Sequence, residues 1–280
     1  MTRIFGVIGS PIAHSLSPAM QTAALNALRL DAVYSAFEVP PQFLKPVLKA
    51  LVLAGVEGLN VTVPLKEAVI PLLDRLDPAA RAIGAVNTIL IRNRKLTGCN
   101  TDAAGFAAAL KEMGWRFKPS RVVILGAGGA AKAVAWQLSQ TRGTQLTIAN
   151  RHLKRAQQLS RWLSKKTQAR VKAVSFRAVD LSGVDLLVNA TSLGMKAHDP
   201  SPIALDGLSR RTMVYDLVYH RQTKLVLKAR QRGCVAAGGL SMLLYQGAAS
   251  LRLWTKHRPP VAVMRRALIC ALDAKPREKH

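Results

Sequence analysis

The segment 120–140, SRVVILGAGGAAKAVAWQLSQ, constrains the fold of this chain more strongly than any other stretch. A run of apolar residues leads into Gly126, and a helix-like pattern follows Gly129. Gly126 allows a tight turn and Gly128 lets a pyrophosphate approach the backbone, while Ala131 replaces the third glycine of this fingerprint. Free N–H groups and the positive dipole end of the helix favour an anion at the turn. We therefore expect a dinucleotide-binding strand–turn–helix unit, with an ordinary βα turn as the alternative.

The end of the next strand indicates which dinucleotide is bound. In dinucleotide folds that use NAD, an acidic residue about 20 residues after the glycines binds the ribose 2′-hydroxyl. This chain instead reads IANRHLKRA at 148–156, with Asn150 and Arg151 at the strand end and Arg155 one helical turn later. A guanidinium is planar and bidentate, so it suits a 2′-phosphate. The sequence therefore predicts NADP as the cofactor.

Strand and helix patterns alternate along the whole chain, which is typical of an α/β fold with mostly parallel sheets. Before the glycine turn the patterns predict strands at 4–8, 34–38 and 58–63, helices at 18–28 and 41–54, and a hairpin over 85–102 that turns at Asn93 and Arg94. After it they predict strands at 145–149, 171–174, 184–189 and 213–218, and helices at 153–165, 224–232, 241–255 and 261–272. Asp74 and Asp77 are expected to mark the end of a helix.

Length and composition exclude several classes of protein. A chain of 280 residues with 49% hydrophobic and 20% charged residues is globular and forms one large or two ordinary domains. No apolar run reaches the roughly 18 residues of a membrane span, and the N-terminus is a poor signal peptide. Cys99, Cys234 and Cys270 are widely spaced, and no His, Asp or Glu cluster has metal spacing. We expect no metal, no disulfide framework and no membrane partner, and a cytoplasmic location.

The charge balance is the least ordinary bulk property of the chain. Lys and Arg number 41 against 15 acidic residues, which gives a net charge of +26. Nucleic-acid binding is one interpretation, but the cations form no tail and aromatic residues make up only 5%. Steering of small anions and a solvated basic surface are the other interpretations. Nucleic acid is therefore an unlikely partner, and we expect a monomer or a homodimer.

Further motifs occur along the chain: GSPIAHSLSP at 9–18, GLNVTVPLK at 58–66, GAVNT at 84–88, NTDAAGF at 100–106, GAGGA at 126–130, NATSLGM at 189–195 and GLSMLLYQGA at 239–248. In this order and at these spacings they resemble the shikimate dehydrogenases. The resemblance covers nearly the whole chain, and its second and fourth motifs are more specific than the glycine turn. It implies a substrate domain, 1–101, completed by C-terminal helices in 239–280, and a Rossmann-like NADP domain, 102–238. It also implies an active site in the cleft between the two domains.

The resemblance implies an activity in chorismate and aromatic amino acid biosynthesis: reversible hydride transfer between C3 of shikimate and NADP, giving 3-dehydroshikimate and NADPH. Lys66 and Asp102 would form the catalytic pair. The implied substrate contacts are Ser15, Ser17, Thr62, Asn87, Tyr219 and Gln246, with the two serines on the carboxylate. The implied cofactor contacts are Gly126, Ala127, Gly128, Gly129, Ala130, Asn150, Arg151, His152, Arg155, Thr191, Ser192, Met195, Leu217 and Gly239.

The chemistry of these residue types agrees with that activity. Oxidation of a secondary alcohol needs a proton acceptor at the hydroxyl, and lysine serves as a general base or acid when its proton is poised. Lys66 follows a strand that ends at Pro64, so it lies at the carboxyl end of the strand, where open α/β sheets bind their ligands. A lone lysine at such a position is usually a solvated helix residue. The surrounding motifs make Lys66 the candidate acid–base group.

The sequence departs from the family pattern at a few places. Gln21 and Thr22 stand where the family usually has His-Asn, and we expect a changed packing contact there. The segment HRQT after Tyr219 is one residue shorter than usual and lacks the common proline, which bears on turnover or selectivity. His152 stands where a small residue is common and either contacts the adenosine or is an ordinary surface histidine.

Two other functions remain open at this point. One is a quinate or dual quinate/shikimate dehydrogenase that uses NAD, which Ser15, Ser17 and the missing acid after the second strand disfavour. The other is a basic binding protein on an inactive dehydrogenase fold. The presence of both Lys66 and Asp102 disfavours that second alternative.

Overall fold

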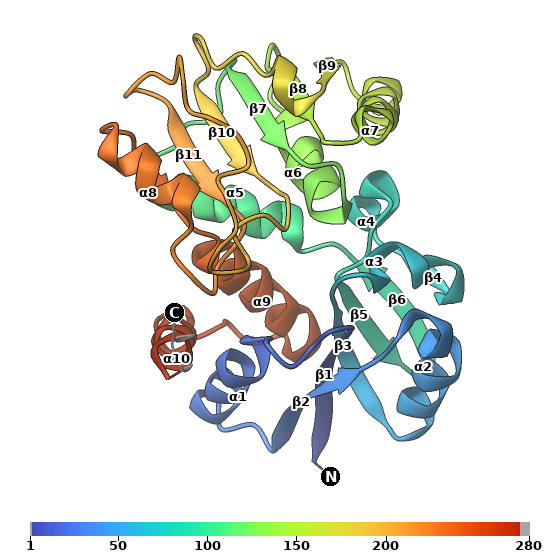
Figure 1. Cartoon of the computed structure of the whole chain (residues 1–280). Coiled ribbons are helices and arrows are strands. Elements are labelled where there is room, and N and C mark those ends of the chain that lie inside the picture. The colour runs from blue at the N-terminus through green and yellow to red at the C-terminus, as the bar shows by residue number, and fades with distance from the viewer. Residues whose placement is uncertain (1, 275–280) are drawn as a thin grey trace. The chain divides into compact units, whose positions relative to one another are not determined.

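The computed structural model describes residues 2–274, which form two compact α/β units (Figure 1). The first unit contains the chain up to Gly105 and resumes at Leu243, and the second spans Phe106–Met242. These boundaries fall a few residues after the predicted 101 and 238. The α/β class predicted from the alternating patterns is confirmed.

The sheet of the first unit is mixed. Its strands, in the order β2-β1-β3-β5-β6-β4, are β1 (Arg3–Gly9), β2 (Ala32–Glu38), β3 (Val56–Val61), β4 (Arg75–Leu76), β5 (Thr88–Arg92) and β6 (Lys95–Cys99). β1 pairs in parallel with β2 and β3, whereas β5 is antiparallel to β3 and β6. The predicted hairpin is confirmed, because Asn93 and Arg94 connect β5 to β6 with φ angles of 49° and 59°. Positive φ at both central residues is what a tight two-residue hairpin turn requires.

Helices of the first unit are α1 (Ser17–Ala27), α2 (Leu44–Leu53), α3 (Leu65–Ala68), α4 (Pro78–Ile83), most of α9 (Leu240–Thr255), and α10 (Val261–Asp273). Short 3-10 turns, η1 (Pro41–Phe43) and η2 (Ile70–Leu72), precede α2 and follow α3. α1 packs against α10, and α2 contributes Leu44 and Leu48 to the core on the sheet. The helices predicted at 18–28, 41–54, 241–255 and 261–272 are thus confirmed within a few residues.

The prediction that Asp74 and Asp77 mark the end of a helix is wrong for Asp77, whereas Asp74 directly follows Leu73, the C-cap of η2. Asp77 is the N-cap of α4, because its Oδ1 accepts a hydrogen bond of 2.6 Å from the backbone N–H of Ala80. The carboxylate of Asp74 accepts a hydrogen bond of 2.8 Å from the backbone N–H of Leu96, which links the segment before β4 to β6. An aspartate followed by proline favours the start of a helix, since the carboxylate satisfies a free N–H and proline suits the first helical position.

The second unit contains an all-parallel sheet. Its strands, in the order β12-β11-β10-β7-β8-β9, are β7 (Arg121–Leu125), β8 (Gln145–Ala149), β9 (Arg170–Val174), β10 (Leu186–Asn189), β11 (Met213–Asp216) and β12 (Ala236–Ala237). Its helices are α5 (Asp102–Glu112), whose first residues belong to the first unit, α6 (Gly129–Ser139), α7 (Leu153–Lys166) and α8 (Lys224–Gln231), together with the 3-10 turn η3 (Phe176–Ala178). The chain moves outward from β7 on one side and then returns to β10 on the other. Ligands of such sheets bind beyond the strand ends at this reversal.

Among residues 2–274, no helix combines the length and the apolar character that crossing a bilayer demands.

Trp254 packs α9 against the sheet of the first unit. Its indole stacks on Phe5 with ring centroids 5.3 Å apart, and its Nε1 donates a hydrogen bond of 3.0 Å to the backbone oxygen of Ile89. The ring lies directly over Gly58, where an added Cβ would overlap the indole. Glycine at 58 is therefore required by the packing of α9, and α9 in turn carries Gln246 and Ser250 to the strand ends.

We expect Gly58→Ala to lower the free energy of unfolding by about 1–3 kcal/mol, because the buried indole has no space to yield. Urea denaturation measures the change. In a Trp254→Leu background, Gly58→Ala should lower the free energy of unfolding clearly less, because the ring that the new Cβ would meet is gone. Equal costs in both backgrounds would contradict this packing argument.

Candidate active site

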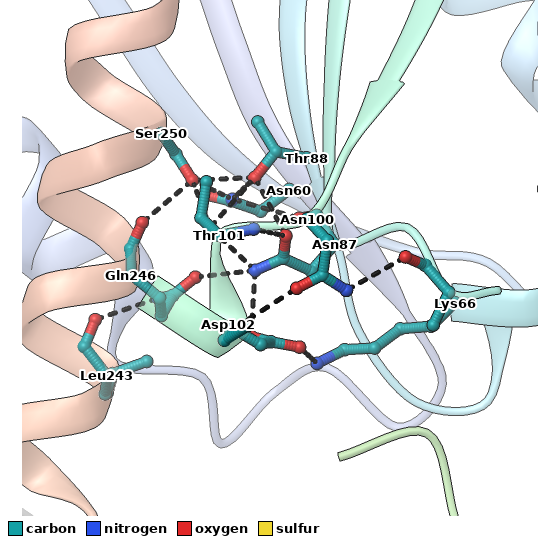
Figure 2. A network of polar contacts seen from close by, with 12 residues as sticks. Asn60, Lys66, Asn87, Thr88, Asn100, Thr101, Asp102, Leu243, Gln246 and Ser250 are labelled. Atoms are coloured by element: carbon teal, nitrogen blue, oxygen red, sulfur yellow. Dashed lines mark hydrogen bonds and ion pairs between the residues drawn. The ribbon is translucent and has the colours of Figure 1, made fainter. Parts of the chain in front are cut away.

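Polar side chains from several motifs meet at one edge of the sheet of the first unit, where β3 and β6 end and β5 begins (Figure 2). β5 runs antiparallel to β3 and β6, so its first residue lies beside the last residues of its neighbours: Thr88 pairs with Asn60 and with Cys99. Lys66 follows β3 on α3, and Asp102 follows β6 at the start of α5. The antiparallel pairing therefore gathers residues that are far apart in sequence.

Lys66 and Asp102 form a largely buried ion pair. The Nζ of Lys66 lies 2.6 Å from Oδ2 of Asp102, and the two side chains are 15% and 6% exposed. The other carboxylate oxygen, Oδ1, accepts a hydrogen bond of 2.8 Å from Nδ2 of Asn87. Both oxygens of Asp102 thus have a donor, which compensates the buried charge and fixes the carboxylate plane. The arrangement places the Lys66 ammonium beside an anion whose orientation is fixed.

Asn87 is almost fully buried, and its amide orientation is determined by its partners. Its Oδ1 accepts the backbone N–H of Thr101 at 2.7 Å, and an N–H group can only donate. Its Nδ2 therefore faces Thr101 Oγ1 at 2.8 Å, Asp102 Oδ1 at 2.8 Å and Gln246 Oε1 at 3.2 Å. The structure thus brings together four of the predicted site residues, Lys66, Asn87, Asp102 and Gln246.

Ser15 and Ser17 lie at the start of α1. The Oγ of Ser15 accepts the backbone N–H of Ser17 at 3.2 Å, and the side chain of Ser17 is buried. Nearby in the first unit, Tyr34 donates to Oδ1 of Asn60 at 2.7 Å. Burial raises the pKa of Tyr34 well above its usual value, so its hydroxyl stays a donor. Asn60 in turn donates from Nδ2 to the backbone oxygen of Asn87 at 3.2 Å, which connects Tyr34 to the cluster around Asn87.

Thr62 follows β3 and is half-buried, with its methyl group against Gly9. A Cβ at position 9 would overlap that methyl group, so glycine is needed there. The backbone N–H of Thr62 donates to the oxygen of Ile8 at 2.9 Å, which holds the β3 exit beside β1.

Tyr34, Asn60, Thr88, Thr101 and Ser250 are members of the cluster that the sequence did not single out. Asn60, Thr88 and Thr101 lie inside the quoted motifs, each within two residues of a predicted site residue. Ser250 is four residues after Gln246, and residues four apart share one face of a helix. These spacings are signals from which the supporting residues can be found.

The glycine turn of the second unit has the geometry that its sequence predicts. Gly126 has a φ of 111°, a conformation that favours glycine, and its N–H donates to Ala149 O at 2.7 Å. Gly128 caps α6, and a Cβ built there would meet no atom within 4 Å. The space in front of Gly128 is therefore open, as approach of a phosphate group requires. Ala131 is fully buried at the helix–strand contact.

The loop after β8 lies beside this turn, because β7 and β8 are neighbouring parallel strands. Asn150 begins the loop and donates from Nδ2 to the backbone oxygen of His152 at 3.1 Å. The side chains of Arg151, His152 and Arg155 are exposed at the start of α7. Arg151 is thus carried on the loop next to the glycine turn, and Arg155 on the first turn of α7.

A buried carboxylate fixes the loop after β10. Oδ1 of Asn189 accepts the hydroxyl of Thr191 at 2.7 Å, and its Nδ2 donates to Asp216 at 2.9 Å. Asp216 is fully buried and also accepts the hydroxyl of Thr223 at 2.7 Å. Burial raises the pKa of Asp216, while these hydrogen bonds act in the opposite direction. Asp216 therefore ties the loop that contains Thr191 and Ser192 to the loop that ends at Thr223.

The shortened HRQT segment is anchored at both ends. His220 Nε2 lies 2.8 Å from the backbone oxygen of Met195, and Thr223 caps α8. Met195 is 52% exposed. Burial raises the pKa of Tyr219, which the structure places in the second unit, whereas the other predicted substrate contacts belong to the first.

Leu217 and Gly239 meet at the same edge of the second sheet. Leu217 donates its N–H to Asn189 O at 2.9 Å, and a Cβ at Gly239 would overlap the backbone oxygen of Leu217. The predicted cofactor residues therefore lie on the loops, or on the first helical turns, that follow β7, β8, β10, β11 and β12. Within residues 2–274, no three His, Cys, Asp or Glu side chains are arranged to hold a metal ion.

Gln21, which departs from the family pattern, has a packing role. It is fully buried, and its Nε2 donates to Gly247 O at 2.9 Å, linking α1 to α9.

Comparisons with known proteins match nearly the whole chain. Residues 7–89 match the family model "Shikimate dehydrogenase substrate binding domain", residues 107–198 match "Shikimate / quinate 5-dehydrogenase", and residues 239–269 match "Shikimate 5'-dehydrogenase C-terminal domain". A shikimate dehydrogenase (NADP+) of Methanopyrus kandleri is 42% identical, over 96% of this chain and 95% of that protein.

Solved structures agree with the sequence comparison. A shikimate dehydrogenase in complex with NADP+ superposes with a TM-score of 0.91 at 37% identity, over 97% of this chain and 96% of that one. A shikimate 5-dehydrogenase of Thermus thermophilus in complex with NADP(H) and shikimate gives a TM-score of 0.88 at 38% identity, over 96% and 100% of the two chains.

The two glycines of the turn should respond differently to alanine. We expect Gly126→Ala to lower the free energy of unfolding by about 1–3 kcal/mol, because its φ is positive and the new Cβ would lie 2.7 Å from Ala190 O. The free energy of unfolding of Gly128→Ala should stay within about 0.5 kcal/mol of the wild-type value, because the space around Gly128 is open. Thermal and urea unfolding of both variants measure this difference. Similar losses in both would contradict the open site at Gly128.

Proposed function

The chain belongs to the shikimate dehydrogenase family, and from this premise we propose that it reduces 3-dehydroshikimate reversibly to shikimate with NADPH. It is an NADP-dependent oxidoreductase that acts on a CH–OH group. One observation carries the assignment of chemistry to residues: the buried pair of Lys66 and Asp102, held by Asn87, in the unit that matches the family's substrate-binding domain. The product serves aromatic amino acid biosynthesis by way of chorismate.

Lys66 moves the proton of the reaction. In the oxidation direction, the ammonium of the resting ion pair first gives one proton to solvent, and the resulting amine of Lys66 takes the proton of the C3 hydroxyl of shikimate as the C3 hydrogen leaves as hydride. NADP+ held by the second unit would supply the acceptor for that hydride. The carboxylate of Asp102, 2.6 Å from Nζ, stabilises the ammonium that is restored. Reduction follows the same steps in reverse, with Lys66 as the acid.

The first unit supplies the groups that bind shikimate. Ser15 and Ser17 donate hydrogen bonds to the substrate carboxylate at the start of α1, where the helix dipole favours an anion. Asn87, Asp102 and Gln246 contact the ring hydroxyls, because their polar atoms meet beside the strand ends. Thr62, which directly follows β3, is assigned to the same ring contacts. Tyr219 contributes a further contact from the second unit.

The second unit supplies the groups that bind NADP. Gly126, Ala127, Gly128, Gly129 and Ala130 would hold the pyrophosphate at the N-terminus of α6. Arg151 and Arg155 would pair with the 2′-phosphate, flanked by Asn150 and His152. The nicotinamide end would be held by Thr191, Ser192, Met195, Leu217 and Gly239. The open space at Gly128 and the exposed guanidinium of Arg151 support this fit.

The alternatives differ from this proposal in substrate, cofactor or partner. The absence of an acid after β8 disfavours NAD, and an inactive fold has no need to keep a buried Lys66–Asp102 pair. We propose a cytoplasmic monomer or homodimer without a nucleic-acid partner. The test is to follow reduced-cofactor absorbance with shikimate or quinate, crossed with NADP or NAD. The pair shikimate and NADP should give the highest kcat/KM, and a higher value for quinate or NAD would contradict the proposal.

Removal of the Lys66 amine should abolish most turnover. We expect Lys66→Ala to fold and to lose about 10²–10⁴-fold in kcat for shikimate oxidation, because the general base is lost. Lys95→Ala is the matched control, since Lys95 also pairs with an aspartate, Asp74 at 3.2 Å, but on an exposed surface. The control should keep wild-type turnover. Retention of more than about a tenth of kcat in Lys66→Ala would remove Lys66 from the mechanism.

Cofactor choice should depend on the charge of Arg151. We expect wild-type kcat/KM for NADP to exceed that for NAD at least tenfold, by about 1.4 kcal/mol or more, and the preference to shrink as salt screens the exposed guanidinium. Arg151→Asp should strongly lower use of NADP and leave use of NAD unchanged or better. Arg161→Asp, with the same charge change further along α7, is the control. Equal loss of both cofactors in Arg151→Asp would mean that Arg151 supports the loop instead.

A further inference from the structure

A cluster of buried hydroxyls lies on the side of Asn87 that faces away from Lys66 and Asp102 (Figure 2). Thr88 and Ser250 are fully buried, and their hydroxyl oxygens are 2.7 Å apart. Thr101 Oγ1 lies 3.2 Å from Ser250 Oγ and 3.3 Å from Thr88 Oγ1. These hydroxyls come from β5, from α9 and from the segment before α5, which are separate elements of the first unit.

The directions of the hydrogen bonds in this cluster follow from its two amides. Asn60 Nδ2 donates to Ser250 Oγ at 3.0 Å and to the backbone oxygen of Asn87 at 3.2 Å, which fixes its orientation. The Thr88 hydroxyl donates to Asn87 Oδ1 at 3.2 Å, and Ser250 donates to Thr88 or to the backbone oxygen of Gln246 at 3.0 Å. Every hydroxyl therefore has both an acceptor and a donor.

The cluster contacts the proposed site residues in two places, at Asn87 and at the turn of α9 that carries Gln246. Thr88 is one of the two donors to Asn87 Oδ1, and the opposite side of that amide donates to Asp102 Oδ1. Ser250 joins β5 to the turn of α9 that carries Gln246, whose Oε1 lies 3.2 Å from Asn87 Nδ2. Neither hydroxyl itself touches Lys66 or Asp102 among the hydrogen bonds of residues 2–274.

We propose that Thr88 and Ser250 are positioning residues that hold the Asn87 amide, and through it the Asp102 carboxylate and Gln246, in the geometry needed for turnover of shikimate. The inference rests on the proposed function. Loss of either hydroxyl removes a restraint on Asn87 or on α9, and the amide can then turn away from Asp102. Since a displacement of about 1 Å at reacting groups costs up to about 100-fold in rate, the effect on catalysis should be measurable.

Matched substitutions at Thr88 separate the hydroxyl from the shape of the side chain. Thr88→Val keeps the branched shape, suits a strand and removes the hydroxyl, whereas Thr88→Ser keeps the hydroxyl and removes a methyl group. We expect Thr88→Val to lose about 10- to 100-fold in kcat/KM for shikimate with KM for NADP unchanged, and Thr88→Ser to stay within about threefold of the wild type. Circular dichroism establishes that both variants are folded at the assay temperature.

A purely structural role predicts a different pattern, in which the two variants lose activity alike or in proportion to their loss of Tm. Either that pattern or an unchanged Thr88→Val would overturn the proposal. Ser250→Ala should resemble Thr88→Val. Thr255→Val removes a buried hydroxyl of the same helix that donates only to Leu251 O, at 2.8 Å, and serves as the control with wild-type activity. Equal losses in Ser250→Ala and this control would also count against the proposal.

Calorimetric titration of shikimate into the cofactor-free whole chain separates failure of this inference from failure of the proposed function. If the wild type binds shikimate but does not oxidise it with NADP, the proposed function fails, and a weakened affinity in Thr88→Val but not in Thr88→Ser still supports the positioning role. If the wild type is active and the Thr88 variants bind and turn over shikimate equally, only the positioning role fails. If the wild type neither binds nor oxidises shikimate, both fail.

Discussion

The carboxylate of Asp102 accepts donors on both oxygens, from Lys66 at 2.6 Å and from Asn87 at 2.8 Å, and much of the first unit is arranged around this interaction. A buried charge pair is favourable only when its remaining hydrogen-bonding capacity is satisfied. Asn87 meets that requirement because the Thr101 backbone and the Thr88 hydroxyl fix the other side of its amide. The hairpin of β5 and β6 brings those groups together, because it places Thr88 beside Cys99, close to Thr101 and Asp102. The position of the buried charge therefore depends on the hairpin.

The same polar groups also specify the fold. A hydrogen-bonded chain runs from Tyr34 through Asn60 to Thr88 and Asn87, and it crosses β2, β3 and β5. A shift of one residue in the pairing of β3 with β5 would turn Asn60 and Thr88 to opposite faces and leave buried polar atoms without partners. Such networks are costly when incomplete, so they favour one register. The second unit uses a comparable arrangement, in which Asp216 accepts from Asn189 and Thr223 and holds two loops together.

Local patterns predict most of the elements, because a strand, a glycine turn or a two-residue hairpin is encoded by neighbouring residues. β8 begins and ends at the predicted residues, and Asn93 and Arg94 form the expected turn. The patterns do not predict α5, whose alanine-rich sequence DAAGFAAALKE has little contrast between faces, and they reverse the role of Asp77. The lysine at the β3 exit was identifiable from its motif, whereas the contacts of Tyr34 and Ser250 depend on segments that meet only in the folded unit. Tertiary proximity of that kind has no local sequence signal.

The central claim is that Lys66 and Asp102 act as one unit, and a double-mutant cycle tests it most directly. The kcat for shikimate oxidation with NADP is measured for Lys66→Ala, Asp102→Asn and the double variant, with circular dichroism to establish that each is folded. Groups that act together are strongly non-additive, because removal of either one already forfeits the shared effect. We expect the kcat of the double variant to lie within about threefold of the kcat of the slower single variant. Losses that multiply across the two sites would show that Lys66 and Asp102 contribute independently and would contradict the account.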